Sequence, residues 1–302
     1  VFNLKRVMAN LKEIRNRITS IESTMQITSA MKMVSASKLK RAQDANTQMR
    51  PYANKLQEIL SNLSSSLDMS ENDFASNKEV NNIVILCVTS NRGLCGGFNN
   101  NVIKATMKLA RDEYAGKNVS VLSVGKKAND VFKKTEFNIK GSYLPGHLEE
   151  LWNDLRFDNV APVAEKIMKA YTDGHIDKVI LVYNSFKNVA TQIVTTEQFL
   201  PILPPVVNEG EKANANLDYI FEPSKTEIVD ELIPKSLKVQ MYSAMLESFA
   251  GEHGARMTAM HKATDNAGEM NKELKLDYNK ARQAAITNEI LEIVGGAEAL
   301  NN

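Results

Sequence analysis

The stretch from Met8 to Arg50, MANLKEIRNRITSIESTMQITSAMKMVSASKLKRAQDANTQMR, contains neither proline nor glycine. From Lys235 to the C-terminus there is no proline either, and the few glycines are single or lie near the end. Runs of this length without helix breakers are typical of coiled coils and helical rods. At about 1.5 Å per residue, about 65 residues of continuous helix would extend roughly 100 Å. The two ends of the chain therefore predict a rod, and such a rod indicates a partner around it.

Composition excludes few functions. The chain has 302 residues, enough for one or two domains, and its net charge of +1 gives no global attraction to nucleic acid. Its two cysteines, Cys87 and Cys95, are too few for a disulfide framework and fit a reducing compartment. No apolar run approaches the ~20 residues that cross a bilayer, and residues 1–7 lack the apolar core of a signal peptide. We expect a soluble chain that meets membranes only through partners; whether residues 1–7 belong to the mature chain stays open.

Apolar residues in the N-terminal stretch recur in alternating steps of three and four, which predicts a coiled-coil seam. The seam positions are Leu11, Ile14, Ile18, Ile21 and Met25, then Leu39, Ala42, Met49, Ala53, Leu56, Leu60 and Leu63. Between these runs the seam falls on Thr28, Lys32 and Ser35, while the apolar residues are Ile27, Ala30, Met31 and Val34. Two interpretations stay open: a register slip that lets the helices wind, or a second contact surface for another protein. Pro51 should kink or end the first helical segment.

A helical seam also follows the C-terminal stretch. Its positions are Tyr242, Leu246, Phe249, His253, Met257, Met260, Thr264, Ala267, Leu274, Tyr278, Ala281 and Ala285. The last turns are apolar on more than one face, at Ile286, Ile290, Leu291, Ile293 and Val294. We expect this tip to be enclosed, because in a monomer it would be an exposed patch. The N-terminal stretch is basic and the C-terminal one mildly acidic, which favours their pairing.

The middle of the chain has an α/β pattern. Strand-like runs at 83–88, 119–124 and 179–183 alternate with helical patterns at 98–114 and 160–171, as in a parallel sheet with helices. Residues 189–195 could add an antiparallel edge strand. Pro201, Pro204 and Pro205 open a linker into the C-terminal helix, which should begin near Glu222 or Lys225.

The glycine-rich turn after the first strand is where an active site would be sought. It matches neither a dinucleotide-binding nor a Walker A motif. Gly93 to Gly97 does match G-x-C-x-G, a nucleophile elbow with Cys95 in place of serine, although a tight turn with a packed thiol is the simpler interpretation. The four histidines have no metal-ligand spacing, so we expect no catalytic residue, metal or cofactor.

Several motifs resemble one family, the γ subunits of F-type ATP synthases. The C-terminal run from Ile286 to Ala299, ITNEILEIVGGAEA, looks like the family's C-terminal signature. The segments at 255–260, 263–267 and 278–283 are similar to the same family, as are Ile14-Arg15, the run 27–34 and the turn 92–97. The resemblance covers the chain from Met8 to Ala299 in the right order.

The resemblance implies a fold and a function. The fold is α/β: an antiparallel coiled coil of the N- and C-terminal helices (8–65 and 222–302) and a central Rossmann-like domain (80–205). It implies a non-catalytic rotor subunit, the central stalk of the complex, with one copy inside a hexamer of three α and three β subunits. The foot would meet an ε-type subunit and the membrane ring of c subunits. Proton flow would turn this shaft and change the nucleotide affinity of each β site in sequence. No regulatory cysteine segment of the chloroplast type is present, so thiol switching is not expected.

Carried over residue by residue, the family's contacts with the α/β hexamer fall on Met31, Arg256, Arg282, Gln283, Thr287 and Glu289. Arg256 and Arg282 would offer forked donors to acidic loops of β, while Gln283 and Thr287 would form neutral hydrogen bonds. From the residues alone, Arg256 could instead pair with Glu252 at i−4 on the surface of the rod.

Location and two other functions are further hypotheses. The cytoplasmic face of a bacterial plasma membrane is the first expectation for location, and the matrix side of the mitochondrial inner membrane is the second. A cysteine hydrolase that uses Cys95 and a self-dimerising coiled-coil scaffold are the alternative functions.

Overall fold

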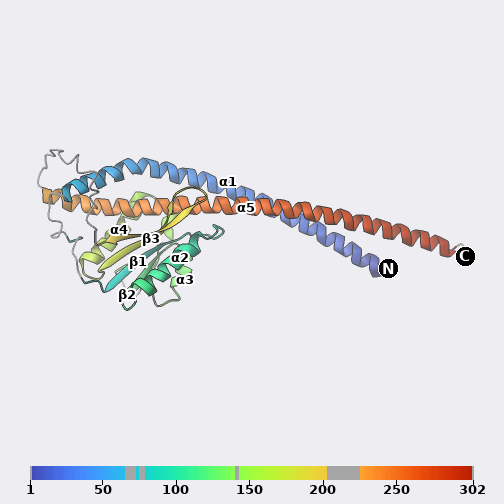
Figure 1. Cartoon of the computed structure of the whole chain (residues 1–302), viewed down its shortest axis with the longest axis horizontal. Helices are drawn as coiled ribbons and strands as arrows, with labels where there is room; N and C mark the ends of the chain where they lie inside the picture. Colours follow the sequence, from blue (N-terminus) through green and yellow to red (C-terminus); the bar gives the residue numbers. More distant parts are fainter. Residues whose placement is uncertain (1, 65–72, 75–78, 140–142, 203–224, 301–302) are drawn as a thin grey trace. The chain divides into compact units, whose positions relative to one another are not determined.

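The computed structural model describes residues 2–64, 73–74, 79–139, 143–202 and 225–300. Two long helices enclose a central α/β region in the sequence (Figure 1). The helices are α1 (Phe2–Ser64), α2 (Phe98–Lys108), α3 (Lys126–Phe132), α4 (Phe157–Thr172) and α5 (Lys225–Leu300), with a π-helical turn (Leu109–Glu113) after α2 and a 3-10 turn at Glu150–Trp152. The strands are β1 (Asn82–Val88), β2 (Asn118–Val124), β3 (Lys178–Phe186) and β4 (Gln192–Leu200).

The four strands form one sheet in the order β2-β1-β3-β4. β1 pairs in parallel with both β2 and β3, and β4 pairs antiparallel with β3. This confirms the predicted α/β arrangement and its antiparallel edge strand. Helix α3 was not predicted, because its sequence KKANDVF is too short and polar for a helical period to show.

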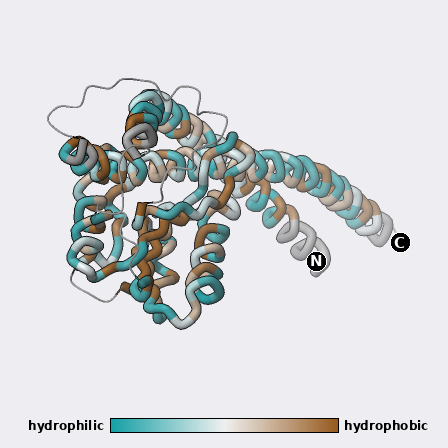
Figure 2. The backbone as a smooth tube through the Cα atoms, turned by 60° about the vertical axis from the view of Figure 1, so that its left-hand side comes forward, coloured by the Kyte–Doolittle hydropathy of each residue, from teal (hydrophilic) through white to brown (hydrophobic). Residues whose placement is uncertain are grey.

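Alternate residues of the central strands feed two separate cores, as the two-residue period of a strand requires. On one face Val84, Leu86 and Val88 pack with α4 and α5. On the other face Ile83, Ile85 and Cys87 pack with α2 and α3. Figure 2 shows brown, hydrophobic segments gathered in the middle of this region, whereas the long helices alternate between teal and brown. The sheet is therefore covered on both faces, which explains the continuous apolar runs of its parallel strands.

The chain divides into two compact units, each built from parts of both long helices. The first consists of Val1–Ser35 and Met257–Asn302, and the second is Ala36–Arg256. In the first unit Arg15 Nη2 donates to the Tyr278 hydroxyl (2.7 Å), and the hydroxyls of Thr28 and Thr264 share a hydrogen bond (2.8 Å). Residue numbers rise along α1 as they fall along α5, so the two helices pair antiparallel, as expected.

In the second unit α5 lies against the sheet. Ile233, Leu237 and Met241 are buried in the core that also contains β1 and α4. Leu39 and Ala42 of α1 contact Ala250 of α5 in a smaller cluster. The predicted α1 seam thus packs on α5 in this unit too, against Ala250 and its neighbour Phe249, of which only Phe249 is a predicted seam position.

Two alternatives from the sequence need correction. Of the two expectations for Pro51, an end of the helix is wrong, because α1 continues to Ser64 and Leu56, in the next turn, is buried; a kink at Pro51 stays a prediction. Packing of that turn offsets the hydrogen bond that proline cannot make. The register slip is also wrong: Thr28 and Ser35 are buried, so the seam keeps its register through the polar positions. The burial of Leu63 lies outside the described side chains.

Candidate partner-contact surface

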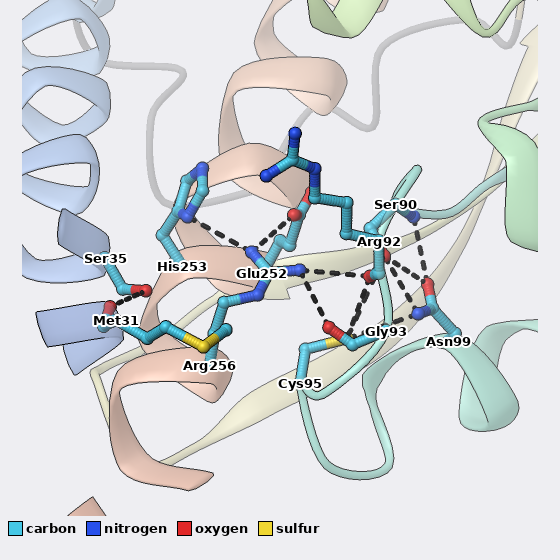
Figure 3. A network of polar contacts seen from close by, with 10 residues as sticks. All are labelled: Met31, Ser35, Ser90, Arg92, Gly93, Cys95, Asn99, Glu252, His253 and Arg256. Atoms are coloured by element: carbon cyan, nitrogen blue, oxygen red, sulfur yellow. Dashed lines mark hydrogen bonds and ion pairs between the residues drawn. The ribbon is translucent and has the colours of Figure 1, made fainter. Parts of the chain in front are cut away.

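Apolar side chains of α1 face away from the seam near Met31. Ile27 is 60% exposed and Val34 57% exposed, whereas the seam residue Ser35 is buried. Met31 is half-buried, and its carbonyl accepts a hydrogen bond from the Ser35 hydroxyl (2.7 Å; Figure 3). Serine and threonine can occupy a buried seam position because their hydroxyls donate hydrogen bonds to backbone carbonyls of the same helix. The apolar face is therefore a second exposed surface of α1, and its contact with another protein stays a prediction.

The end of α5 brings together four of the predicted contact residues. Arg282, Gln283, Thr287 and Glu289 are all exposed and lie within about two helical turns. The Thr287 hydroxyl donates to the Gln283 carbonyl (3.0 Å). These side chains are therefore available to a partner, and Arg282 presents a forked donor for a carboxylate.

Large apolar residues of the same helix end are exposed as well. Between Ile286 and Val294 the exposed fractions run from 46% to 71%. The exposed apolar residues in this stretch are Ile286, Ile290, Leu291, Ile293 and Val294. The described residues of the chain do not enclose this tip. Its enclosure by another molecule stays a prediction.

Arg256, by contrast, points into the second unit. Its Nη1 donates to Glu252 Oε1 (2.6 Å) and to His253 Nδ1 (3.3 Å), while Nη2 donates to the carbonyls of Arg92 (3.0 Å) and Gly93 (3.3 Å; Figure 3). The ion pair with Glu252 is the i−4 pair that the sequence suggested, but it is buried rather than on a surface. A partner contact of Arg256 stays a prediction; its visible role is to join α5 to the glycine-rich turn.

Burial controls the protonation of the groups around Arg256. Burial raises the pKa of Glu252, and the Arg256 guanidinium opposes this rise. Burial lowers the pKa of His253 to about 3, and the charges of Arg256 and Lys38 lower it further. His253 is therefore neutral, and its Nδ1 accepts from Arg256 while Nε2, which has no hydrogen-bond partner in the structure, carries the proton.

The glycine-rich turn does not form a nucleophile elbow. Cys95 is 1% exposed, and burial raises the pKa of its thiol despite the nearby Arg256. Asn99 Nδ2 donates to its Sγ (3.2 Å), and the Ser90 hydroxyl lies 3.8 Å from it. A nucleophilic cysteine needs a thiolate that substrate can reach, and this thiol is neutral and enclosed. Cys95 thus packs beneath the turn, the simpler interpretation of the motif.

The described residues contain no group of three or more histidine, cysteine and acidic side chains that could hold a metal ion. In the same part of the chain, no helix combines the length and apolarity needed to span a membrane.

Sequence reasoning missed the network that surrounds Arg256. The Arg92 and Gly93 carbonyls are backbone groups more than 160 residues from Arg256, so no sequence pattern could pair them. The Ser90–Asn99 pair was also missed: Asn99 Oδ1 accepts from the Ser90 backbone N–H (2.9 Å), and Asn99 Nδ2 donates to the Ser90 hydroxyl (2.9 Å). Asn99 lies two residues after Gly97, and that position was the available signal.

Comparisons with known proteins agree on one family. The family model described as ATP synthase matches residues 10–300. The ATP synthase gamma chain of Flavobacterium johnsoniae is 60% identical over 97% of this chain and 100% of its own length. The corresponding chain of Christiangramia forsetii is 58% identical over the same shares.

Solved structures show the same fold at lower identity. A chain of the rotor of the Euglena gracilis mitochondrial ATP synthase matches with a TM-score of 0.61 at 19% identity, over 92% of this chain and 99% of that one. A chain of the central stalk and c-ring structure of the Tetrahymena thermophila enzyme matches with a TM-score of 0.58 at 24% identity, over 78% and 99%. The chain therefore belongs to the gamma-chain family of the ATP synthases, the central-stalk subunits of these rotary complexes.

Proposed function

We propose that this chain is the rotating shaft of an F-type ATP synthase. It couples proton flow through a membrane ring of c subunits to ATP synthesis or hydrolysis in a hexamer of α and β subunits. The observation that carries the proposal is the exposed apolar end of α5, from Ile286 to Val294, on a chain of the gamma family. Exposed apolar clusters of this kind mark surfaces that a partner covers. Here the partner is the inner wall of the hexamer.

An uneven surface supports this role. A shaft that touched all three β subunits equally would change none of their nucleotide affinities, because only differential contacts shift an equilibrium. Ile27 and Val34 present apolar surface on α1, whereas Arg282 and Glu289 present charge on α5. Different chemistry on different sides of the shaft is what sequential changes at three sites require.

The proposed contacts with the hexamer are Met31, Arg256, Arg282, Gln283, Thr287 and Glu289. Arg282 offers its fork to acidic loops of β, and Gln283 and Thr287 offer neutral hydrogen bonds. The exposure of the Arg282, Gln283 and Thr287 side chains supports this assignment. Met31 lies beside the exposed apolar face of α1, where a β loop would pack. For Arg256 a contact would be additional to its internal hydrogen bonds.

The chain itself performs no chemistry in this proposal. Catalysis takes place in the β subunits, and the neutral, enclosed thiol of Cys95 supports a structural role for the turn. We assign residues 8–65 and 222–302 to the rod and residues 80–205 to the foot domain; within these bounds, residues 65, 203–205, 222–224 and 301–302 lie outside the described part of the chain. The foot meets the ε-type subunit and the c-ring. Because the most similar relatives quoted above come from bacteria, we place the complex on the cytoplasmic face of the plasma membrane.

Reconstitution with separately purified α and β subunits tests the proposal. We expect one copy of the chain per hexamer of three α and three β subunits, measured by light scattering after size exclusion. The ATPase activity of the mixture should depend on the added chain. A chain that stays alone, or that pairs only with itself, contradicts the shaft and favours the self-dimerising scaffold.

Substitution of Met31 by lysine tests the proposed site on α1. Met31→Lys places a charge beside an apolar contact, so we expect normal assembly but at least about twofold fewer protons pumped per ATP hydrolysed. Lys40, exposed on the same helix, provides the matched control as Lys40→Met. An unchanged proton-to-ATP ratio in Met31→Lys would count against this role for Met31.

A further inference from the structure

We propose that Arg256 and Glu252, together with a glycine face of α5, form a joint that carries torque between the sheet domain and α5. Arg256 acts in this joint as a positioning residue for the turn Arg92–Gly97. The inference rests on the proposed function, because torque passes through the joint only if the chain rotates. All of the contacts that carry it lie within the compact unit Ala36–Arg256.

The guanidinium of Arg256 bridges two elements that are distant in sequence. Nη1 is held by Glu252 on the preceding turn of α5, and Nη2 holds the carbonyls of Arg92 and Gly93 in the turn after β1 (Figure 3). Because the guanidinium is planar and rigid, fixing one side of the fork fixes the direction of the other. A sideways displacement of α5 therefore has to carry the turn with it or break two hydrogen bonds.

The turn that Arg256 holds is itself braced against the sheet. The Ser90 hydroxyl donates to the Arg92 carbonyl (2.6 Å), and the Ser90 backbone N–H donates to Asn99 Oδ1 at the start of α2 (2.9 Å). The Asn91 side chain donates to the Glu149 carbonyl (2.9 Å) and accepts from the Lys126 backbone N–H (2.9 Å). A force that enters at the Arg92 carbonyl is thus distributed to β1, α2 and α3.

Two glycines let α5 approach the sheet closely on the same segment. A Cβ at Gly251 would lie 3.4 Å from Phe98 Cε2 and 3.5 Å from the Asn184 carbonyl. A Cβ at Gly254 would lie 3.3 Å from Phe186 Cε2 and 3.4 Å from the Val189 carbonyl. The helix backbone therefore lies directly on the β3–β4 hairpin, and this close fit opposes sliding.

An apolar cluster adds α1 to the joint. Leu39 and Ala42 of α1 contact Ala250 of α5, and Phe186 and Val189 of the hairpin pack against the same residues. Both long helices and the hairpin thus meet in one cluster beside the Arg256 network. The sheet domain is consequently attached to both helices of the rod and not to α5 alone.

Burial makes the Glu252–Arg256 pair suited to this task. Their side chains are 9% and 8% exposed, so water competes little for the hydrogen bonds. The pair Glu231–Lys235 has the same i,i+4 spacing on the same helix, but it is exposed on both sides. Exposed pairs of this kind rearrange freely and transmit little force.

Arg256→Lys in the whole complex, reconstituted into proteoliposomes, tests the joint. Lysine keeps the charge beside Glu252 but loses the fork that also reaches the two carbonyls. We expect hydrogen exchange of the amides at 92–97 to become about tenfold faster, equivalent to about 1.4 kcal/mol. The number of protons pumped per ATP hydrolysed should fall at least about twofold. Lys235→Ala, which removes the exposed pair, should change neither quantity.

Gly254→Ala is the second variant, since it alters the joint and leaves every predicted partner contact unchanged. We expect faster exchange in the 186–192 hairpin and a lower proton-to-ATP ratio. Gly268→Ala is its matched control, because the added Cβ there would meet only Met25 Sδ, at 3.8 Å. Faster exchange at either site with an unchanged ratio would overturn the torque role and leave a purely structural contact. Failure of the proposed function is seen separately, as an unaltered chain that does not assemble with α and β.

Discussion

The middle and the end of α5 contain the same kinds of large apolar residue in opposite surroundings. In the middle, Ile233 and Leu237 are 1% and 2% exposed against the sheet and α4. At the end, Leu291 and Ile293 are 63% and 71% exposed. One continuous helix therefore carries one segment whose apolar side chains are buried within the chain and one segment whose apolar side chains are exposed.

This difference separates folding from assembly along a single helix. Burying a side chain of this size contributes about 1.5–3 kcal/mol relative to leaving it exposed. In the middle of α5 that free energy stabilises the fold of the chain. At the end it is still available for association with a partner. Substitutions in the middle should therefore change the stability of the chain, and substitutions at the end should change its association with a partner.

The largest effect is expected from removing a buried charge partner in the middle of α5. Glu252→Ala leaves the Arg256 guanidinium buried without its counter-ion, so the free energy of unfolding should fall by about 3–5 kcal/mol. The exposed Glu289 at the end of the helix is the control, and Glu289→Ala should change stability by less than about 0.5 kcal/mol. Urea unfolding followed by circular dichroism measures both. Equal effects would mean that burial of the pair contributes nothing to its strength.

A large-to-small substitution in each segment tests the apolar side of the comparison. Leu237→Ala opens a cavity in the main core and should lower the free energy of unfolding by about 2–5 kcal/mol. Leu291→Ala removes the same atoms from an exposed site and should cost less than about 0.5 kcal/mol in the isolated chain. Thermal unfolding of the two variants beside the unaltered chain provides the measurement. A clear loss of stability in Leu291→Ala would show that the chain itself covers its tip.

Sequence patterns were sufficient to predict the helices and strands, but they were insufficient to predict which polar residues are buried. The apolar runs and helical periods correctly predicted the long helices, the parallel strands and the antiparallel edge strand. Near Met31 they left two interpretations open, a register slip or a second surface, because Thr28 and Ser35 are polar. In the structure Thr28 Oγ1 donates to the Met25 carbonyl (3.1 Å) and Ser35 to that of Met31, so both tolerate burial.

The contact residues at the end of α5 could be predicted from the sequence, whereas the surroundings of Arg256 could not. Arg282, Gln283, Thr287 and Glu289 are neighbours in sequence and therefore neighbours on one helix. The surroundings of Arg256 depend on the backbone carbonyls of Arg92 and Gly93, which lie in the turn after β1 and more than 160 residues away in the sequence. Periodicity within a helix predicts contacts along that helix, and long-range contacts of this kind need the folded chain.

A smaller effect should follow from the buried histidine of the middle segment. The pKa of His253 is about 3 in the folded chain, against about 6.5 when unfolded. Between these values the unfolded state binds the extra proton, so stability is full above pH 6.5 and is lost as the pH falls. From pH 6.5 to 5 the loss from His253 should be about 1–2 kcal/mol.

The variant His253→Gln isolates this contribution, because Glu252, Arg256 and Lys38 remain beside it. Unfolding by urea at pH 7, 6 and 5 (roughly one unit per step) should give a shallower pH dependence in His253→Gln than in the unaltered chain. If stability depended on pH equally in both proteins, His253 would bind its proton as readily in the folded chain as in the unfolded chain, which would contradict the pKa lowered by burial.

The smallest effect on the isolated chain, and the one that best separates the two segments, is expected at Ile290. Ile290→Ser changes an exposed side chain, so the stability of the chain alone should stay within about 0.5 kcal/mol. Enclosed by the hexamer, the same residue would bury its apolar surface, and its loss should weaken assembly with α and β by about 1–2 kcal/mol, or roughly tenfold in affinity. Titration of labelled hexamer with the chain measures this change. If assembly and stability were both unaffected, Ile290 would be an ordinary exposed residue, and the cover of the tip would have to lie on another face of α5.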